Sequence, residues 1–176
     1  MKTLSTVRQG LSVLFCACFL MMAAMVNAEA LTKSQLDSWL ATTEDLIPLQ
    51  SVLDSMGEDS TVAKQYTEEE FEALAIDKQN EVMDEMLKEQ GVYDDIYAVL
   101  KPNGWSHAGD YMRIGNRLGK AISVHMQNQM LANLPPEQAQ MVKEMTGNDI
   151  DAAPEDIAFV TEHWETIEGF MGKFMQ

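Results

Sequence analysis

Cysteine is almost absent from this sequence. Its 176 residues include only Cys16 and Cys18, and both precede Ala28. A chain that loses its first 28 residues holds no thiol, so we expect neither a disulfide framework nor a cysteine nucleophile. An apolar core must then stabilise the fold.

The first 28 residues have the pattern of a secretory signal peptide. Lys2 and Arg8 make the start positive, Leu11–Val26 is apolar and uncharged, and Val26-Asn27-Ala28 places small residues before the expected cut. The apolar run is shorter than the roughly 20 residues of a membrane-spanning helix. We predict a signal peptide at 1–28, cleavage after Ala28, a single helical domain at 29–176 and no stable membrane insertion.

Glycosylation sites are missing from the predicted processed chain. Residues 29–176 contain no Asn-x-Ser/Thr sequence, and small secreted eukaryotic domains are usually rich in disulfides. Together with the lack of cysteine, this favours a bacterial envelope. We therefore expect a periplasmic or secreted protein.

Basic residues are few. The sequence has 12 Lys and Arg against 28 Asp and Glu, and removal of Lys2 and Arg8 leaves 10 against 28, a net charge of −18. Such a surface repels nucleic acid and anionic lipid headgroups and keeps the protein soluble. The partners that it attracts are cations or basic segments of other proteins.

Strand patterns are lacking as well. No segment alternates apolar and polar residues convincingly, and no Asn-Gly or Asp-Gly joins two β-branched runs. Apolar residues recur at helical spacing instead. We therefore predict an all-α fold, a compact bundle of about six helices, which cover approximately 33–47, 67–90, 93–100, 105–134, 136–147 and 154–174.

Local signals predict several helix boundaries. Thr32–Gln35 and Thr67–Glu70 have the spacing of a capping box, which marks a helix start. Pro48 is expected to kink or break the first helix. Gly91 is expected to end the helix that begins at Thr67.

The longest helical pattern without proline is Trp105–Leu134. Gly115 and Gly119 lie on its apolar side, and each costs about 1 kcal/mol of helix propensity relative to alanine. We expect close packing of another helix to offset this cost, with a ligand or partner surface as the alternative. The other residues on the face expected to be buried are Tyr111, Ile114, Leu118, Ile122, His125 and Met126.

Catalytic and metal-binding signatures are missing. The sequence has no Gly-x-Ser-x-Gly, no His-x-x-x-His or Glu-x-x-His, and no phosphate-binding glycine loop. We expect a non-enzymatic protein without cofactor or metal. His125 and His163 lie on apolar faces and are expected to be packed, hydrogen-bonded core residues. In the alternative, they meet between their helices and contribute to a binding site.

Arg113, Arg117 and Lys120 form the only basic cluster after residue 28. In the interpretation that the acidic composition favours, they pair with the acidic helix at 67–90. In the alternative, they form a site for an anion or carboxylate, which paired arginines suit. The carboxylates expected for pairing are those of Asp77, Glu81, Asp84 or Glu85.

Methionine is frequent, with 14 residues, ten of them after residue 28. Most are expected to fill gaps in the core, because the thioether side chain is flexible. Met126, Met130, Met141 and Met145 gather around the junction between the fourth and fifth predicted helices. If exposed, they form an adaptable apolar surface for other chains.

Two segments resemble the Leu-Thr-x-x-Gln motif of the Spy/CpxP family of periplasmic helical proteins. Leu31-Thr32-Lys33-Ser34-Gln35 matches in full, and Leu134-Pro135-Pro136-Glu137-Gln138 has Pro135 in place of the threonine. The resemblance implies a non-enzymatic chaperone or a regulator of envelope-stress and metal-stress signalling. It also implies a cradle-shaped helical dimer.

Two functional hypotheses follow. The first is a non-enzymatic periplasmic helical protein that binds other proteins, chaperone-like or as an envelope-stress adaptor. The second is a small-molecule or metal-ion binding protein that uses the two histidines or the basic cluster. An exposed apolar patch favours the first, and a closed pocket with converging polar groups favours the second. The oligomeric state stays open.

Overall fold

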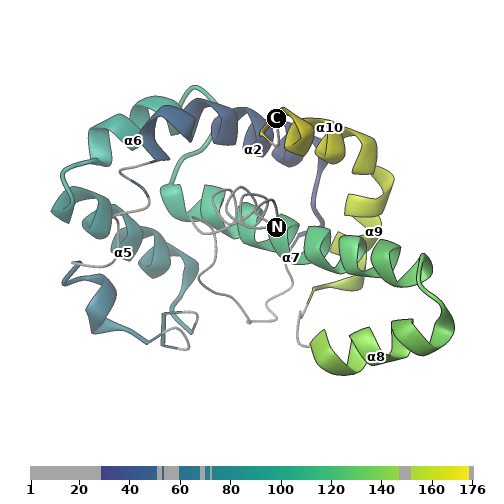
Figure 1. Ribbon diagram of the computed structural model, residues 1–176. Coiled ribbons are helices and arrows are strands. Elements are labelled where there is room, and N and C mark those ends of the chain that lie inside the picture. The colour runs from purple at the N-terminus through teal and green to yellow at the C-terminus, as the bar shows by residue number, and fades with distance from the viewer. Residues whose placement is uncertain are drawn as a thin grey trace, which may run out of the picture. The chain divides into compact units, whose positions relative to one another are not determined.

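The computed structural model describes residues 29–50, 53, 60–67, 70–71, 73–146 and 152–174. These residues form helices and turns and no strand, which confirms the all-α prediction (Figure 1). The predicted signal peptide lies outside them. The α-helices are α2 (Lys33–Leu46), α5 (Ile76–Glu89), α6 (Tyr93–Leu100), α7 (Ala108–Ala132), α8 (Pro136–Thr146), α9 (Pro154–Glu162) and α10 (Trp164–Phe174), and the 3-10 helices are η2 (Ile47–Leu49) and η3 (Ala63–Gln65).

The described residues fall into two compact units. The first contains Thr32–Asn116, and the second contains Arg117–Phe174 together with Glu29–Leu31. The boundary lies within α7, so this helix contributes its first part to one unit and its second part to the other. Each unit has its own buried apolar residues. The single domain and the bundle stay predictions.

The start of α2 follows its capping box. The Thr32 hydroxyl accepts a hydrogen bond from the backbone N–H of Gln35 at 3.2 Å, and the Gln35 side-chain oxygen accepts one from the Thr32 N–H at 2.9 Å. These bonds satisfy donors that the first turn leaves open. As predicted, Pro48 interrupts the α-helix: α2 ends at Leu46, and η2 follows.

The helix predicted at 67–90 is interrupted, so that prediction is wrong in part. Its capping box forms: the Thr67 N–H donates to the Glu70 carboxylate at 2.8 Å, and the Glu70 N–H donates to the Thr67 hydroxyl at 3.3 Å. Residues 73–75 are nevertheless not helical, and α5 begins at Ile76. The capping box at Thr67 thus begins a helical turn, but this turn does not continue into α5.

Local hydrogen bonds close both ends of α5. The Gln79 side-chain amide donates to the carbonyl of Leu74 at 2.9 Å, which satisfies an acceptor within the interruption. At the other end, Gly91 has a φ of 72°, a left-handed conformation that favours glycine. The Val92 N–H donates to the Leu87 carbonyl at 3.0 Å. The prediction that Gly91 ends this helix is confirmed.

Aromatic side chains and threonines connect α2 with the start of α7 in the first unit. Trp105 Nε1 donates to the buried Thr42 hydroxyl at 2.8 Å, and the hydroxyls of Thr43 and Tyr111 are 2.9 Å apart. The Trp39 ring stacks on that of Tyr111, with 6.3 Å between centroids. The threonine hydroxyls allow polar aromatic residues to pack at the core without losing their hydrogen bonds.

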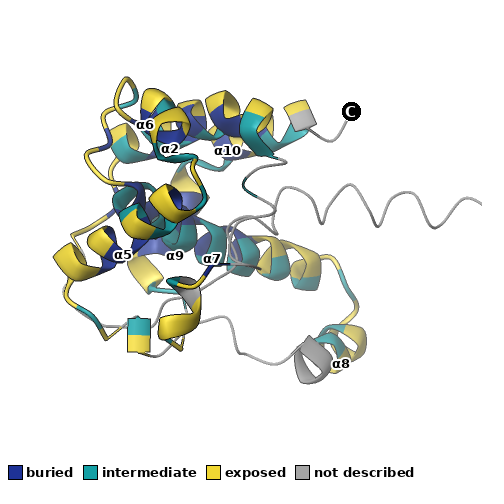
Figure 2. Ribbon diagram, turned by 90° about the vertical axis from the view of Figure 1, so that its left-hand side faces the viewer, coloured by how far each residue is buried: buried dark blue, intermediate teal, exposed yellow. Residues whose placement is uncertain are grey.

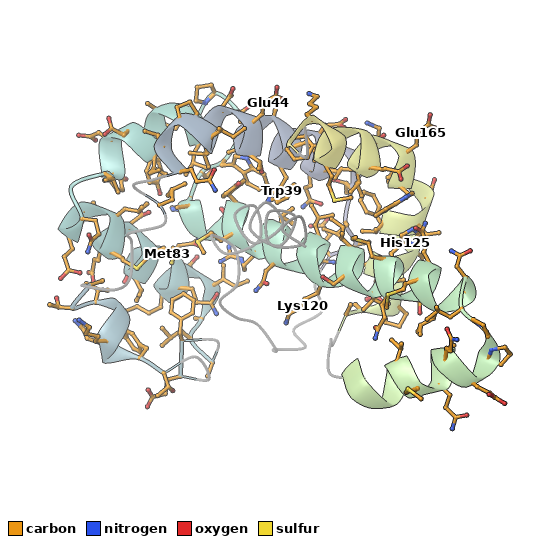
Figure 3. All side chains as sticks on the ribbon, in the orientation of Figure 1. Trp39, Glu44, Met83, Lys120, His125 and Glu165 are labelled. Carbon is orange, nitrogen blue, oxygen red and sulfur yellow. The ribbon has the colours of Figure 1, made fainter. Side chains whose placement is uncertain are left out.

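Gly115 and Gly119, the two glycines of α7 predicted on its apolar side, have different surroundings. A Cβ placed at Gly115 would lie 2.5 Å from Nε1 of Trp39, which is labelled between α2 and α7 in Figure 3. A Cβ at Gly119 would meet nothing within 4 Å. The prediction of close internal packing is therefore confirmed for Gly115 and wrong for Gly119.

In the second unit, the buried face of α7 continues through Leu118 and Ile122 to His125. Met126, which was predicted on this face, is 41% exposed. The reason is that the helix leaves its core here: residues 126–133 are all exposed or half-buried. Further buried apolar residues of this unit are Leu31, Ala121, Val160, Ile167 and Phe170.

The last predicted helix is two helices, α9 and α10, which are separated at His163. The backbone of His163 has φ −102° and ψ 16°, outside the α-helical range. Neither proline nor glycine occurs at the break, so the helix-breaking signals of the sequence do not predict it. The described residues consequently contain seven α-helices, and the expected number of about six is not confirmed.

Candidate functional site

His125 is buried in the second unit, and both of its ring nitrogens have hydrogen-bond partners. Its Nδ1 lies 3.0 Å from the Thr161 hydroxyl, which donates to the Ile157 carbonyl at 2.8 Å. Its Nε2 lies 2.8 Å from the side-chain nitrogen of Gln129. The ring also lies 4.3 Å from that of Trp164.

His163 has a different neighbour. Its ring meets Phe159 edge-on, with 4.5 Å between centroids. The described contacts therefore give each histidine its own packed environment. Within the described part of the chain, no three His, Cys, Asp or Glu side chains form a group that could hold a metal ion.

Arg117 joins three segments of the second unit. Its Nε and Nη2 donate to the two carboxylate oxygens of Asp156 at 2.9 and 2.6 Å, and its Nη1 donates to the Glu29 carbonyl at 2.9 Å. Asp156 is only 3% exposed and lies in the first turn of α9. Such a two-point ion pair fixes both position and orientation. Arg117 therefore ties α9 and residue 29 to α7.

Arg113 is paired within the first unit. Its Nη1 donates to the Asn80 side-chain oxygen at 3.0 Å, and its Nη2 pairs with Asp110. Burial lowers the pKa of Arg113, and the negative charges of Asp110 and Asp77 oppose this shift. The ion pair of Arg113 is therefore with Asp110 of its own helix, and its hydrogen bond to α5 goes to the uncharged side chain of Asn80.

Two of the carboxylates that were expected to pair with the arginines, those of Glu81 and Asp84, have other partners. Glu81 pairs with Lys78 at 2.8 Å, and Asp84 accepts a hydrogen bond of 2.5 Å from the buried Tyr97 hydroxyl. Lys120, also labelled in Figure 3, is half-buried on α7. Helical geometry places it about 140° around the helix from His125, five residues further on.

Exposed methionines distinguish the end of α7 and α8 from the rest of the described chain. Met126, Met130 and Met141 are 41%, 47% and 61% exposed. Figure 2 shows the last turns of α7 and the described residues of α8 as largely exposed. We call residues 126–141 the methionine segment. The side chain of Met145, which was predicted in the same group, lies outside the description.

The methionine segment also lacks charge. Residues 121–142 include a single charged side chain, Glu137, in a sequence with 23% charged residues. The exposed polar residues between the methionines are mostly amides, among them Asn128, Gln129, Asn133, Gln138 and Gln140. The low number of charged residues is visible in the sequence and could have identified the segment as a candidate site. The exposure of the segment could not be predicted, because a periodic apolar stripe alone does not show whether another element covers it.

The two motif-like segments both start helices. The first is the capping box of α2, and Leu31, which precedes it, is 7% exposed. The second begins α8 with Pro136 as first helical residue, as predicted, and the Ala139 N–H donates to the Pro135 carbonyl at 2.9 Å. Both segments thus have a structural role at a helix N-terminus.

Comparisons with protein-family models, with curated proteins and with solved structures found no match for this chain. Within the described residues, no helix has both the length and the apolar character needed to cross a membrane.

Proposed function

We propose that this chain is exported to the periplasm and, after loss of its signal peptide, acts as a non-enzymatic helical protein that binds other proteins through the methionine segment. The exposure of Met126, Met130 and Met141 in an almost uncharged stretch supports this proposal. The centres of protein interfaces are enriched in methionine and depleted in charge. Methionine side chains also adapt to partners of different shape.

The charge of the chain indicates the chemistry of the partner. The predicted processed chain has a net charge of −18, and residues 117–174 with 29–31 contain ten acidic and four basic residues. Such a surface attracts basic segments and repels acidic ones. The partner that fits is therefore a protein segment that combines apolar side chains with lysine or arginine. The resemblance to chaperone-like envelope proteins is in keeping with such a role.

The start of the described chain supports the proposed processing. Leu31 is buried, and Arg117 binds the carbonyl of Glu29, the residue directly after the predicted cut. Residues that directly follow the predicted cut therefore take part in the contacts of the second unit. The mass of the protein recovered from the periplasmic fraction tests this directly, because cleavage after Ala28 leaves Glu29 as first residue.

A binding measurement with matched variants tests the proposed function. The protein, expressed from the whole sequence, is titrated into a fluorescent peptide of leucines and lysines. Replacement of Met126, Met130 and Met141 by glutamine should weaken binding about tenfold or more, or roughly 1.4 kcal/mol. The control replaces Ile47 and Ile76, 39% and 49% exposed, by glutamine and should change affinity little.

Two results contradict the proposal. One is unchanged affinity in the methionine variant while circular dichroism shows an intact fold. The other is equal loss of affinity in the isoleucine control, which indicates unspecific hydrophobic binding. Self-association of the protein in analytical ultracentrifugation, abolished in the methionine variant, identifies a second copy of the chain as occupant and also overturns the proposed partner.

Small-molecule or metal-ion binding, the alternative, has less support. The described polar atoms of His125, Arg113 and Arg117 engage neighbouring residues of the same chain. An external ligand has to displace these contacts, including a bidentate ion pair. The alternative stays a prediction.

A further inference from the structure

We infer that Met126, Met130 and Met141 are sites of reversible oxidation, and that their conversion to sulfoxides switches off binding by the methionine segment. The inferred loss of binding rests on the proposed function. The inferred pattern of oxidation does not, because it follows from the exposure of each side chain.

Thioethers are the only sulfur groups in the predicted processed chain. Both cysteines precede residue 29, whereas ten methionines follow it. An oxidant of the peroxide class therefore finds no thiol in residues 29–176, and methionine is the remaining side chain with readily oxidised sulfur.

Exposure separates the methionines of the described chain into two groups. Side chains are described for seven of them, and the three that are exposed all lie within residues 126–141. Met83 is 9% exposed in the core of the first unit, and Met86, Met112 and Met171 are half-buried. A peroxide molecule needs direct access to the sulfur, so Met126, Met130 and Met141 are expected to react before the buried Met83.

The chemistry balances without a cofactor. Hydrogen peroxide transfers one oxygen atom to the thioether sulfur: the O–O bond breaks, an S=O bond forms and water leaves. The sulfur loses two electrons, and the peroxide gains them. Methionine sulfoxide reductases reverse the step at the expense of a dithiol, which becomes a disulfide.

A sulfoxide changes the property on which the proposed binding depends. It replaces a flexible apolar group by a polar one that accepts hydrogen bonds. Met126 and Met130 are one helical turn apart on α7, so their oxidation alters the same face twice. The exposed amides nearby, such as Asn128 and Gln129, offer donors to the new oxygen atoms. The fold is expected to tolerate the change because the three side chains are outside the core.

Timed oxidation of the folded protein tests the first half of the inference. The protein from the whole sequence is treated with hydrogen peroxide, digested and analysed by mass spectrometry for the sulfoxide content of each methionine. Met126, Met130 and Met141 should react roughly tenfold faster than Met83, as exposure governs access. In guanidinium chloride all four should react at similar rates. Equal rates in the folded protein overturn the inferred pattern.

Binding to the leucine–lysine peptide tests the second half. Oxidised protein should bind about tenfold more weakly, with an unchanged circular dichroism spectrum, and a sulfoxide reductase should restore binding. A variant with leucine at 126, 130 and 141 retains apolar side chains that peroxide does not oxidise. Whatever affinity this variant has before treatment, peroxide should leave that affinity unchanged.

The outcomes separate the two proposals. If untreated protein does not bind the peptide, the proposed function fails, while the oxidation pattern is still decided by mass spectrometry. If untreated protein binds and full oxidation at the three sites leaves affinity unchanged, the switch is refuted and the function stands. If peroxide also abolishes binding by the leucine variant, oxidation elsewhere is responsible and the inferred site is wrong.

Discussion

At the scale of the residue, Glu89 shows how one carboxylate organises a segment. At the end of α5, it accepts hydrogen bonds from the Ser60 hydroxyl at 2.6 Å, from the Thr61 N–H at 2.9 Å and from the Val62 N–H at 3.3 Å. Hydrogen bonds from Ser60 and Thr61 lower the pKa of Glu89 to about 2, because each favours the ionised form. The segment before η3 is thereby attached to α5.

This arrangement predicts a pH dependence with a definite sign. Since the pKa of Glu89 is lower in the folded chain than its ordinary 4.5, its stabilising effect is complete above pH 4.5 and is lost as the pH falls towards 2. Urea titrations between pH 4.5 and 2 should show that the free energy of unfolding of the wild type falls as the pH falls. The Glu89→Gln variant lacks this carboxylate and should not show this part of the fall. At pH 7 the variant should be the less stable protein.

Hydrogen exchange locates the effect. The amides of Thr61 and Val62 should exchange faster in Glu89→Gln at pH 7. Glu85→Gln, an exposed change one turn earlier on α5, is the control and should leave these amides protected. Equal protection in wild type and Glu89→Gln would show that other contacts hold the segment.

At the scale of the element, Gly115 and Gly119 of α7 differ in what lies beside them. Gly115 allows the Trp39 ring of α2 to approach the helix backbone, whereas Gly119 faces open space. Helix propensity penalises both equally. Only Gly115 has a tertiary contact that offsets the cost in helix propensity. Substitutions at Gly115 and Gly119 therefore form a matched comparison within one helix.

Alanine at these two positions should act in opposite directions. Gly115→Ala introduces a Cβ too close to Trp39 and is expected to lower the free energy of unfolding by about 1–3 kcal/mol. Gly119→Ala meets no neighbour and should raise it by about 0.5–1 kcal/mol. Chemical denaturation of both variants checks the prediction. If both are stabilising, Trp39 does not pack as described.

At the scale of the whole molecule, charge of one sign dominates. The predicted processed chain has 28 acidic and 10 basic residues. A large net charge keeps a protein soluble and disfavours its compact state through self-repulsion. Residues 121–142, with Glu137 as their one charged side chain, are exempt from this repulsion.

Salt should therefore stabilise this protein. Between about 0.01 M and 0.15 M NaCl the Debye length falls from about 30 Å to about 8 Å, which screens repulsion between distant carboxylates. The Tm in calorimetry is expected to rise over this range. It should rise less in a variant with Glu162, Glu165 and Glu168 replaced by glutamine, which lowers the predicted net charge to −15. A Tm that falls with salt would mean that favourable ion pairs outweigh the repulsion.

The sequence by itself determined those features that depend on residues only a few positions away along the chain. The all-α class, the cap at Thr32, the interruption at Pro48, the end at Gly91 and the start of α8 at Pro136 all follow from local chemistry. A capping box or a proline acts within one helical turn. Its effect can therefore be read without knowledge of the fold.

Only the tertiary structure decided the features that depend on distant partners. Arg117 pairs with Asp156, 39 residues away, and not with α5. His163 separates α9 from α10 without a local helix breaker, and Met126 is exposed although it continues an apolar stripe. For Arg117 and Met126 the outcome depends on which segment of the folded chain lies nearby. Packing is a property of the folded chain, whereas helical periodicity is a property of the sequence.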